Sequence, residues 1–162
     1  MSLLKKAVAP LLLLAFCFSL ESALCEETVS FPFTGLVTGS GVNLRSGPGR
    51  SYEILLQLAR LSKLNVLAEQ GSWYAVALPE GVPAYVHREY VGEAVEGWAP
   101  VKAERLQVRA RPSGSATVWG ALSALEKVRV LGSYGEWIKI QPPPFCRGWV
   151  HKEYVTAQGA SP

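Results

Sequence analysis

The residues of this chain that could do chemistry are one histidine in each of two similar segments and one cysteine near the C-terminal end. His87 and His151 each begin a His-x-Glu-Tyr-Val run. A cysteine peptidase requires a thiol beside a histidine, and a zinc site requires three or four ligands. The sequence around each histidine offers no second histidine or thiolate. We therefore predict no catalytic and no metal-binding residue. Both histidines are interpreted as capping or turning the last strand, with metal ligation as the alternative.

Cys146 is the cysteine that remains once the first 25 residues are set aside, because Cys17 and Cys25 lie within them. A single thiol cannot form a disulfide within its own chain, so packing must hold the mature protein together. Cys146 corresponds to Val82 in the other similar segment, which predicts a small, buried, apolar position. The alternative is a catalytic or intermolecular thiol, which would need a neighbour that lowers its pKa.

The two similar segments are copies of a repeat with a period of 64 residues. Val42–Tyr52 reads VNLRSGPGRSY, and Leu106–Ala116 reads LQVRARPSGSA with its arginine and proline at the same places. Further along, VHREYV from Val86 matches VHKEYV from Val150. Roughly a third of the aligned positions are identical, which indicates duplication. Two copies are too few for a solenoid, so each copy is predicted to be a small closed domain.

The repeat also predicts how the chain is divided. We predict a signal peptide over 1–25, an extended lead-in over 26–36, a first domain over 37–91, a linker over 92–100, a second domain over 101–155 and a tail over 156–162. An exposed tryptophan in a flexible tether is uncommon, so we expect Trp98 to pack where the two domains meet. The short polar tail is expected to be frayed.

The first residues are typical of a secretory signal. Lys5 and Lys6 precede an apolar run, Val8–Leu20, that is too short to span a membrane, and Ala23-Leu24-Cys25 supplies small residues for cleavage. We therefore expect an exported protein with no stable membrane span after cleavage. The alternatives are an uncleaved membrane anchor and a lipid anchor on Cys25, although Leu24 fits a lipoprotein signal poorly.

The net charge and the acidic residues of the chain exclude some classes of partner and of reaction. Removing Lys5, Lys6 and Glu21 leaves a net charge of about +2, without a long basic run that could follow a phosphate backbone. We therefore expect no nucleic-acid partner. The chain contains no aspartate, which excludes an Asp-centred catalytic triad and the usual calcium loop.

Within each copy, apolar and polar residues alternate with a period of two, as in half-buried strands. In the second copy the apolar positions Val128, Val130, Ile138 and Ile140 alternate with Lys127, Arg129, Lys139 and Gln141. Turns such as Gly47-Pro48-Gly49 and Gln70-Gly71-Ser72 recur at short spacing. This pattern predicts an all-β protein made of small barrels.

Three motifs in order make each copy resemble a known family. VNLRSGPGRSYEIL, KLNVLAEQGSWYAV and AYVHREYV are similar to the bacterial SH3 domain, and LQVRARPSGSATVWG, KVRVLGSYGEWIKI and GWVHKEYV are similar to a more divergent one. The resemblance implies two SH3-like β-barrels in tandem, each a binding or targeting module. Arg111 and Ser113 replace Gly47 and Gly49, so the loops and their ligand preference are expected to differ between the copies.

Strand alternation also predicts which side chains face outward, where they could form a shallow groove for peptide carboxylates and amides. The candidate ligand-binding residues are Asn43, Arg45, Tyr52, Trp73, Tyr85, Arg109, Trp137 and Trp149. The alternative is that loops cover the rings and that Arg45 and Arg109 pair with a local glutamate or carbonyl group.

The expected function is that of a non-catalytic, exported protein that recognises cell-wall (peptidoglycan) peptides and needs no cofactor. The alternative is an envelope subunit that binds another protein and recruits or regulates a separate cell-wall hydrolase. Either reading places the protein in the periplasm or at the external cell wall. Almost every residue after the signal belongs to the two copies or their connections, so we expect no catalytic companion within this chain.

Overall fold

The computed structural model describes residues 30–158, so the predicted signal peptide and the last four residues lie outside the described part. The strands are β1 (Phe33–Val37), β2 (Val42–Arg45), β3 (Ile54–Leu58), β4 (Lys63–Gln70), β5 (Trp73–Ala77), β6 (Ala84–His87), β7 (Trp98–Pro100), β8 (Leu106–Arg109), β9 (Val118–Leu122), β10 (Lys127–Tyr134), β11 (Trp137–Ile140), β12 (Arg147–His151) and β13 (Val155–Ala157). Two single-turn 3-10 helices, η1 (Arg88–Tyr90) and η2 (Lys152–Tyr154), follow β6 and β12. Neither described helix has the length or the apolar character to cross a membrane.

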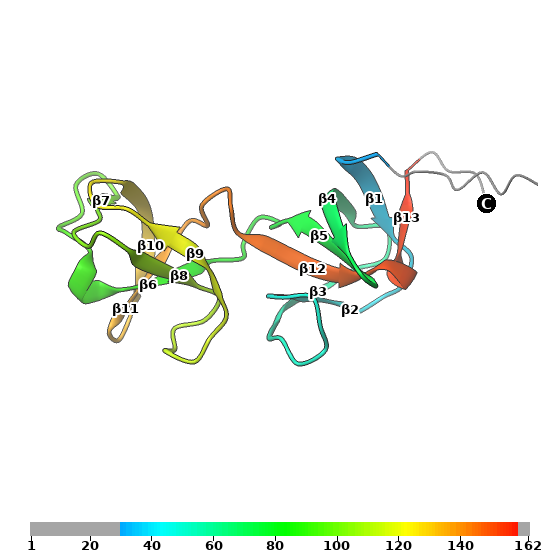
Figure 1. Ribbon diagram of the computed structural model, residues 1–162, viewed down its shortest axis with the longest axis horizontal. Coiled ribbons are helices and arrows are strands. Elements are labelled where there is room, and N and C mark those ends of the chain that lie inside the picture. Colours follow the sequence, from blue (N-terminus) through cyan, green and yellow to red (C-terminus); the bar gives the residue numbers. More distant parts are fainter. Residues whose placement is uncertain (1–29, 159–162) are drawn as a thin grey trace, which may run out of the picture.

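The strands form two sheets, and the two halves of the molecule lie side by side along its long axis (Figure 1). One sheet has the order β13-β1-β4-β5-β12-β2-β3, and the other has the order β7-β10-β11-β6-β8-β9. Every described strand pair is antiparallel. Antiparallel sheets commonly have one buried and one solvated face, which fits the alternating sequence. The prediction of an all-β fold with two modules is confirmed.

Each sheet takes a central strand from the other repeat, and the first sheet also takes the edge strand β13 that follows it. β12 pairs with β5 of the first repeat, with Trp149 opposite Ala75 and His151 opposite Trp73. β6 pairs in the same way with β11 of the second repeat, with His87 opposite Trp137. We call 84–91 and 147–157 the first and second arms. Unit A is then β1–β5 with the second arm, and unit B is β7–β11 with the first arm.

Each unit has a hydrophobic core to which both ends of its sheet contribute. In unit A the core joins Val37 of β1 and Leu58 of β3 to Val150 of the second arm. In unit B it joins Ala99 of β7 and Leu122 of β9 in the same way. The sheets therefore wrap around their cores, but strand pairing leaves the edges β13, β3, β7 and β9 open among residues 30–158. The expected closed barrels appear as wrapped, open sheets.

The segments predicted as lead-in, linker and tail contribute strands to the sheets. β1 lies between β4 and β13, and β7 pairs with β10, so residues at both predicted connections belong to the sheets. Trp98 lies on β7, at the end of unit B farthest from unit A (Figure 1), which differs from its expected place between the domains. Its ring instead faces the guanidinium of Arg129, with 5.7 Å from Cζ to the ring centroid. The start of the tail is ordered by β13, and Gln158 N donates to Thr34 O at 2.8 Å.

Two short crossings, Leu78–Pro83 and Gln141–Cys146, carry the chain between the units. They line a common cleft, so they lie close together, and the side chain of Leu78 packs against both cores. Each crossing contains prolines, three of them consecutive in the second. Proline fixes φ and donates no backbone hydrogen bond, which disfavours a regular hairpin that would return each arm to its own repeat.

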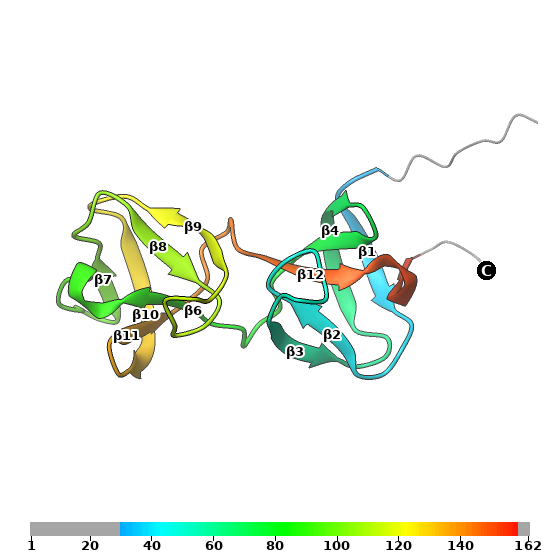
Figure 2. The ribbon, with the colours of Figure 1, turned by 60° about the horizontal axis from the view of Figure 1, so that its bottom comes forward.

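The long loops after β2 and β8 face each other between the units (Figures 1 and 2) and are joined by hydrogen bonds around Glu53. Thr117 N donates to Glu53 Oε1 at 2.9 Å, and the hydroxyls of Ser46 and Thr117 both donate to Glu53 Oε2. Trp119 Nε1 donates to Ser46 O at 3.2 Å. Burial alone would raise the pKa of the Glu53 carboxyl, but these hydrogen bonds outweigh burial and lower the pKa from 4.5 to about 2.

We predict that Glu53→Gln lowers the free energy of unfolding at pH 7 by about 1–2 kcal/mol, because hydrogen bonds to a charged acceptor are replaced by weaker ones at a partly screened site. The pKa of Glu53 is depressed in the folded state, so its contribution is complete above 4.5 and is lost as the pH falls towards 2. Urea unfolding at pH 7 and at pH 2.5 measures both effects. Glu104→Gln, at an exposed site, is the control, and equal stabilities of the two variants at pH 7 would contradict the prediction.

Candidate ligand-binding grooves

Each unit has a surface groove at the same place, beside the end of its arm. Groove A, in unit A, has a volume of about 290 Å³ and is lined by Val42, Asn43, Arg45, Arg50, Trp73, His151 and Tyr154. Groove B, in unit B, is larger at about 470 Å³ and is lined by His87, Glu89, Tyr90, Ala103, Arg105, Leu106, Gln107, Arg109 and Trp137. Five of the eight predicted ligand-binding residues therefore line the grooves.

A cluster of three aromatic rings contributes to each groove, and a histidine lies at its centre. In groove A the His151 ring meets the Trp73 ring edge-on, with 5.3 Å between centroids, and the Tyr154 ring at 6.1 Å. In groove B the His87 ring lies 5.5 Å from that of Trp137, again edge-on, and 5.7 Å from that of Tyr90. Edge-on packing of this kind stabilises aromatic pairs, so the arms hold each histidine between two larger rings.

The histidines sit where the strand of each arm ends and its 3-10 turn begins. His87 and His151 occupy the position before η1 and η2, but neither side chain caps the turn. The turn carries a glutamate back towards each ring, with 3.9 Å from His87 Nδ1 to Glu89 Oε2 and 3.8 Å from His151 Nδ1 to Glu153 Oε2. Each Nδ1 atom is buried and has no hydrogen-bond partner among residues 30–158. The position at a turn agrees with the sequence interpretation, but the described residues show no capping hydrogen bond from either histidine. The rings contribute to the groove walls.

The two central arginines hold the long loops in place. Arg45 Nη1 donates to Arg50 O at 2.9 Å and to Tyr52 O at 2.8 Å. At the corresponding place, Arg109 Nη1 donates to Ala116 O at 2.8 Å. The alternative given by the sequence, pairing with local carbonyl groups, therefore describes both arginines. The arginines therefore shape the grooves by positioning the loops. Nη1 of each guanidinium is already engaged in these hydrogen bonds.

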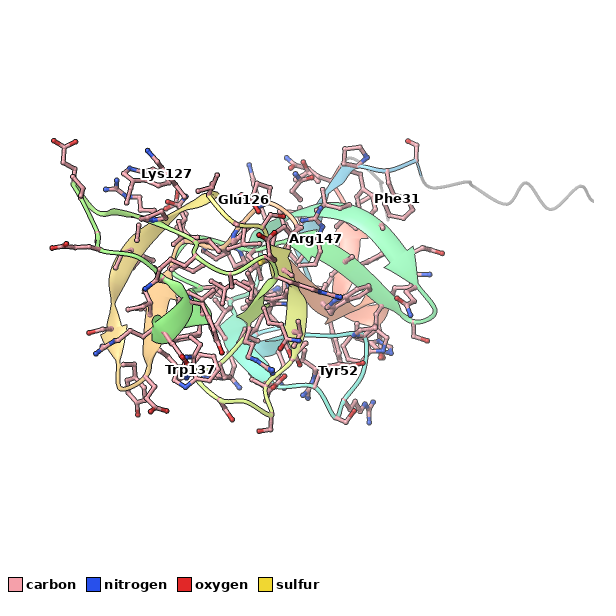
Figure 3. The ribbon with its side chains drawn as sticks, turned by 60° about the vertical axis from the view of Figure 1, so that its left-hand side comes forward. Phe31, Tyr52, Glu126, Lys127, Trp137 and Arg147 are labelled. Carbon is pink, nitrogen blue, oxygen red and sulfur yellow. The ribbon has the colours of Figure 1, made fainter. Side chains whose placement is uncertain are left out.

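The other three predicted residues lie beside the grooves. Tyr52 lies over the loop glycines, so that a Cβ atom on Gly47 would come within 2.2 Å of the tyrosine ring. Trp149 lies opposite Arg45, and Tyr85 lies opposite Arg109. Tyr52 and Trp137 face the same side of the molecule, the lower side in Figure 3. Tyr52, Tyr85 and Trp149 therefore do not line the grooves.

A second arginine enters each groove from a different element. Arg50 comes from the long loop of unit A, where unit B has Gly114, and Arg105 precedes β8 in unit B, where unit A has Gly41. The sequence reasoning missed both, because strand alternation does not apply to loops. It also missed Tyr90 and Tyr154, although the His-x-Glu-Tyr spacing is identical in both copies. This repeated spacing is the sequence signal that identifies the two tyrosines.

Cys146 belongs to the core, as its correspondence to Val82 predicts. The thiol lies in the core of unit B with 3% of its surface exposed, and Val82 is buried as well. Burial raises the pKa of Cys146 to about 12, although the nearby charge of Arg147 acts in the opposite direction. A nucleophilic thiol requires a lowered pKa, so this environment suits a structural residue. Residues 30–158 contain no group of three or more potential metal ligands.

A comparison with protein families tests whether the chain belongs to the family that its sequence motifs resemble. The model of the bacterial SH3 domain matches residues 40–92 and again 104–156. The chain belongs to the bacterial SH3 domain family. The matched segments follow the sequence repeat and each ends with an arm, whereas in the structure each arm pairs with the other copy's strands.

One relative of known sequence aligns with most of the chain. A protein of Bacillus subtilis (strain 168) named as an N-acetylmuramoyl-L-alanine amidase, YrvJ, is 29% identical over 129 residues. The match covers 74% of this chain but only 25% of the Bacillus protein. This chain therefore spans about a quarter of the length of its relative.

We predict that Cys146 of the folded bacterial SH3 protein reacts with iodoacetamide at pH 8 at least about 100-fold more slowly than it does in 6 M guanidinium chloride. The thiol is buried and its pKa of about 12 leaves almost no thiolate at that pH. Mass spectrometry of the alkylated chain measures the rates. The unfolded chain is the internal control, and fast labelling of the folded protein would show an accessible thiol.

Proposed function

We propose that this protein is exported and binds peptides of the bacterial cell wall through grooves A and B, without carrying out a reaction itself. The observation that carries the proposal is the repeated groove, in which a tryptophan, a histidine and a tyrosine lie beside arginine side chains in both units. Aromatic rings with a few placed charges are typical of sites that bind extended peptides. Two grooves on one chain also allow avidity on a polymeric ligand.

The charges of groove B suit a peptide that carries both signs. The lining of groove B includes the arginines Arg105 and Arg109 and the glutamate Glu89. Glu136 approaches from the neighbouring hairpin, with 4.0 Å from its Oε2 to His87 Nε2. Guanidinium groups bind carboxylates in pairs of hydrogen bonds, and carboxylates bind amines. Groove A is lined by Arg50 and Asn43 and, among the described residues, by no carboxylate, so the two grooves are expected to prefer different parts of a ligand.

Three further observations support the proposal. Membership of the bacterial SH3 domain family favours cell-wall binding, and the relative is named as an N-acetylmuramoyl-L-alanine amidase. The environment of Cys146 disfavours a nucleophilic role. Residues 1–25, outside the described part, carry the pattern of a cleaved secretory signal, which would deliver the protein to the periplasm or the outer face of the cell.

Binding to purified peptidoglycan sacculi tests this function. We expect the mature chain to co-sediment with sacculi and Trp73→Ala plus Trp137→Ala to weaken binding at least about tenfold, because buried aromatic rings dominate such sites. Trp98→Ala removes an exposed tryptophan outside both grooves and is the matched control. Circular dichroism confirms folding of each variant. Absence of binding by the wild type, or equal binding by the groove variant, would contradict the proposal.

A second candidate function, binding of an envelope protein, is favoured by a pair of exposed leucines. Leu61 and Leu125 occupy the same position in the two repeats and expose 67% and 84% of their surface. Both adopt positive φ angles of 65° and 71°, a region that costs a branched side chain about 1 kcal/mol or more. Keeping an exposed apolar side chain in a strained conformation in both copies favours a contact with another protein, such as a cell-wall hydrolase that the subunit recruits.

Replacement of both leucines by asparagine tests this second function. Asparagine adopts positive φ more readily, so Leu61→Asn plus Leu125→Asn is expected to leave the free energy of unfolding unchanged or to raise it by up to about 1 kcal/mol. If the leucines bind a protein, a pull-down from envelope extract freed of peptidoglycan retains that protein with the wild type and loses it with the variant. Val95→Asn, exposed but without a positive φ, is the control. Retention by the leucine variant would exclude this surface.

A further inference from the structure

The aromatic cluster of each groove combines residues from both sequence repeats. Trp73 of the first repeat packs on His151 of the second, and Trp137 of the second packs on His87 of the first. The tyrosines follow their histidines, because each lies on the 3-10 turn of the same arm. Neither repeat therefore contains all the rings of one groove.

Backbone hydrogen bonds hold the arms in these exchanged positions in the same way in both units. Lys152 N donates to Ser72 O at 2.9 Å, and Arg88 N donates to Glu136 O at 2.8 Å. These residue pairs are related by the 64-residue period of the repeat. The second arm is also held by an ion pair, with 2.8 Å from Lys152 Nζ to Glu69 Oε2. The backbone contacts of the exchange are thus made twice, once in each unit.

We propose that the ligand-binding module of this protein is the exchanged unit and not the sequence repeat, so that each groove is a composite site built by both copies. Groove B belongs to a continuous stretch of chain, 84–140, which contains all the strands of its sheet. Groove A belongs to a split unit, closed by the second arm after the chain has passed through unit B. That these grooves bind a ligand rests on the proposed function, whereas the placement of the arms does not.

The composite grooves couple ligand binding to the exchange. A ligand that contacts Trp73 and His151 together stabilises the arrangement in which the second arm lies on unit A, by the ordinary linkage between binding and structure. A substitution in the second repeat, His151→Ala, is therefore expected to impair groove A and to leave groove B intact. If each arm closed on its own repeat, the same substitution would impair the groove of Trp137.

Disulfide trapping in the mature chain, without the predicted signal peptide and its Cys17 and Cys25, distinguishes the two arrangements without any ligand. In a Cys146→Val background, the pair Ser72→Cys and Lys152→Cys joins neighbouring backbone segments of the exchanged form, within the reach of a disulfide. We expect this pair to form an intramolecular disulfide on mild oxidation, detected by peptide mapping. The matched control, Ser72→Cys with Arg88→Cys, brings together residues that are neighbours only if the arms are not exchanged. A disulfide in the control and none in the first pair, or a bond only between two chains, would overturn the proposal.

Binding of combined variants to sacculi provides the second measurement. Trp73→Ala and His151→Ala act on the same groove, so their combination is expected to bind within about twofold of the weaker single variant. Trp73→Ala with His87→Ala acts on both grooves and should fall as far as the double tryptophan variant. The composite grooves would be ruled out if Trp73→Ala with His151→Ala bound as weakly as the double tryptophan variant while Trp73→Ala with His87→Ala bound like a single variant. If the wild type binds no sacculi, the proposed function fails, and the disulfide pattern still decides where the arms lie.

Discussion

The antiparallel pairing of each arm with the other repeat is the constraint on which the rest of this structure depends. β12 joins the two parts of the unit A sheet by lying between β5 and β2, and β6 does the same between β11 and β8. Without its arm, each sheet would be divided into two pieces, its core would lose Val150 or Val86, and its groove would lose two of three aromatic rings. Sheet, core and groove are therefore completed by the same few residues.

The exchange also explains the contacts between the units. Because the chain crosses twice, the units are held together on one side by the crossings and on the other by the hydrogen bonds around Glu53. Glu53 and Thr117 occupy the same position in the two repeats, yet they meet each other. Contact between corresponding residues is the mark of a two-fold interface, so one chain here has the organisation of a strand-exchanged dimer.

The two grooves share the same aromatic residues but differ in their charged residues. The tryptophan, histidine and tyrosine recur in both, and Arg45 and Arg109 shape the loops beside them. Arg50 and Arg105 come from non-corresponding positions, so duplication preserved the aromatic surface while the outer charges diverged. Strand alternation predicted the tryptophans and the central arginines, because side chains on strands point to alternate faces. It could not predict the loop arginines or the tyrosines of the 3-10 turns, whose direction depends on how the loop or turn is folded.

By itself, the sequence determined the all-β fold, the two copies, their membership of the bacterial SH3 domain family and the buried position of Cys146. These follow from local patterns, namely alternation, turn residues and the repeat. Only the tertiary structure decided which arm completes which unit, and therefore that β1, β7 and β13 join the sheets and that Trp98 lies far from the junction. The physical reason is that VHREYV and VHKEYV present the same apolar and aromatic side chains at the same spacing. Either arm fits either unit locally, and the choice depends on the proline-containing crossings and the contacts between units.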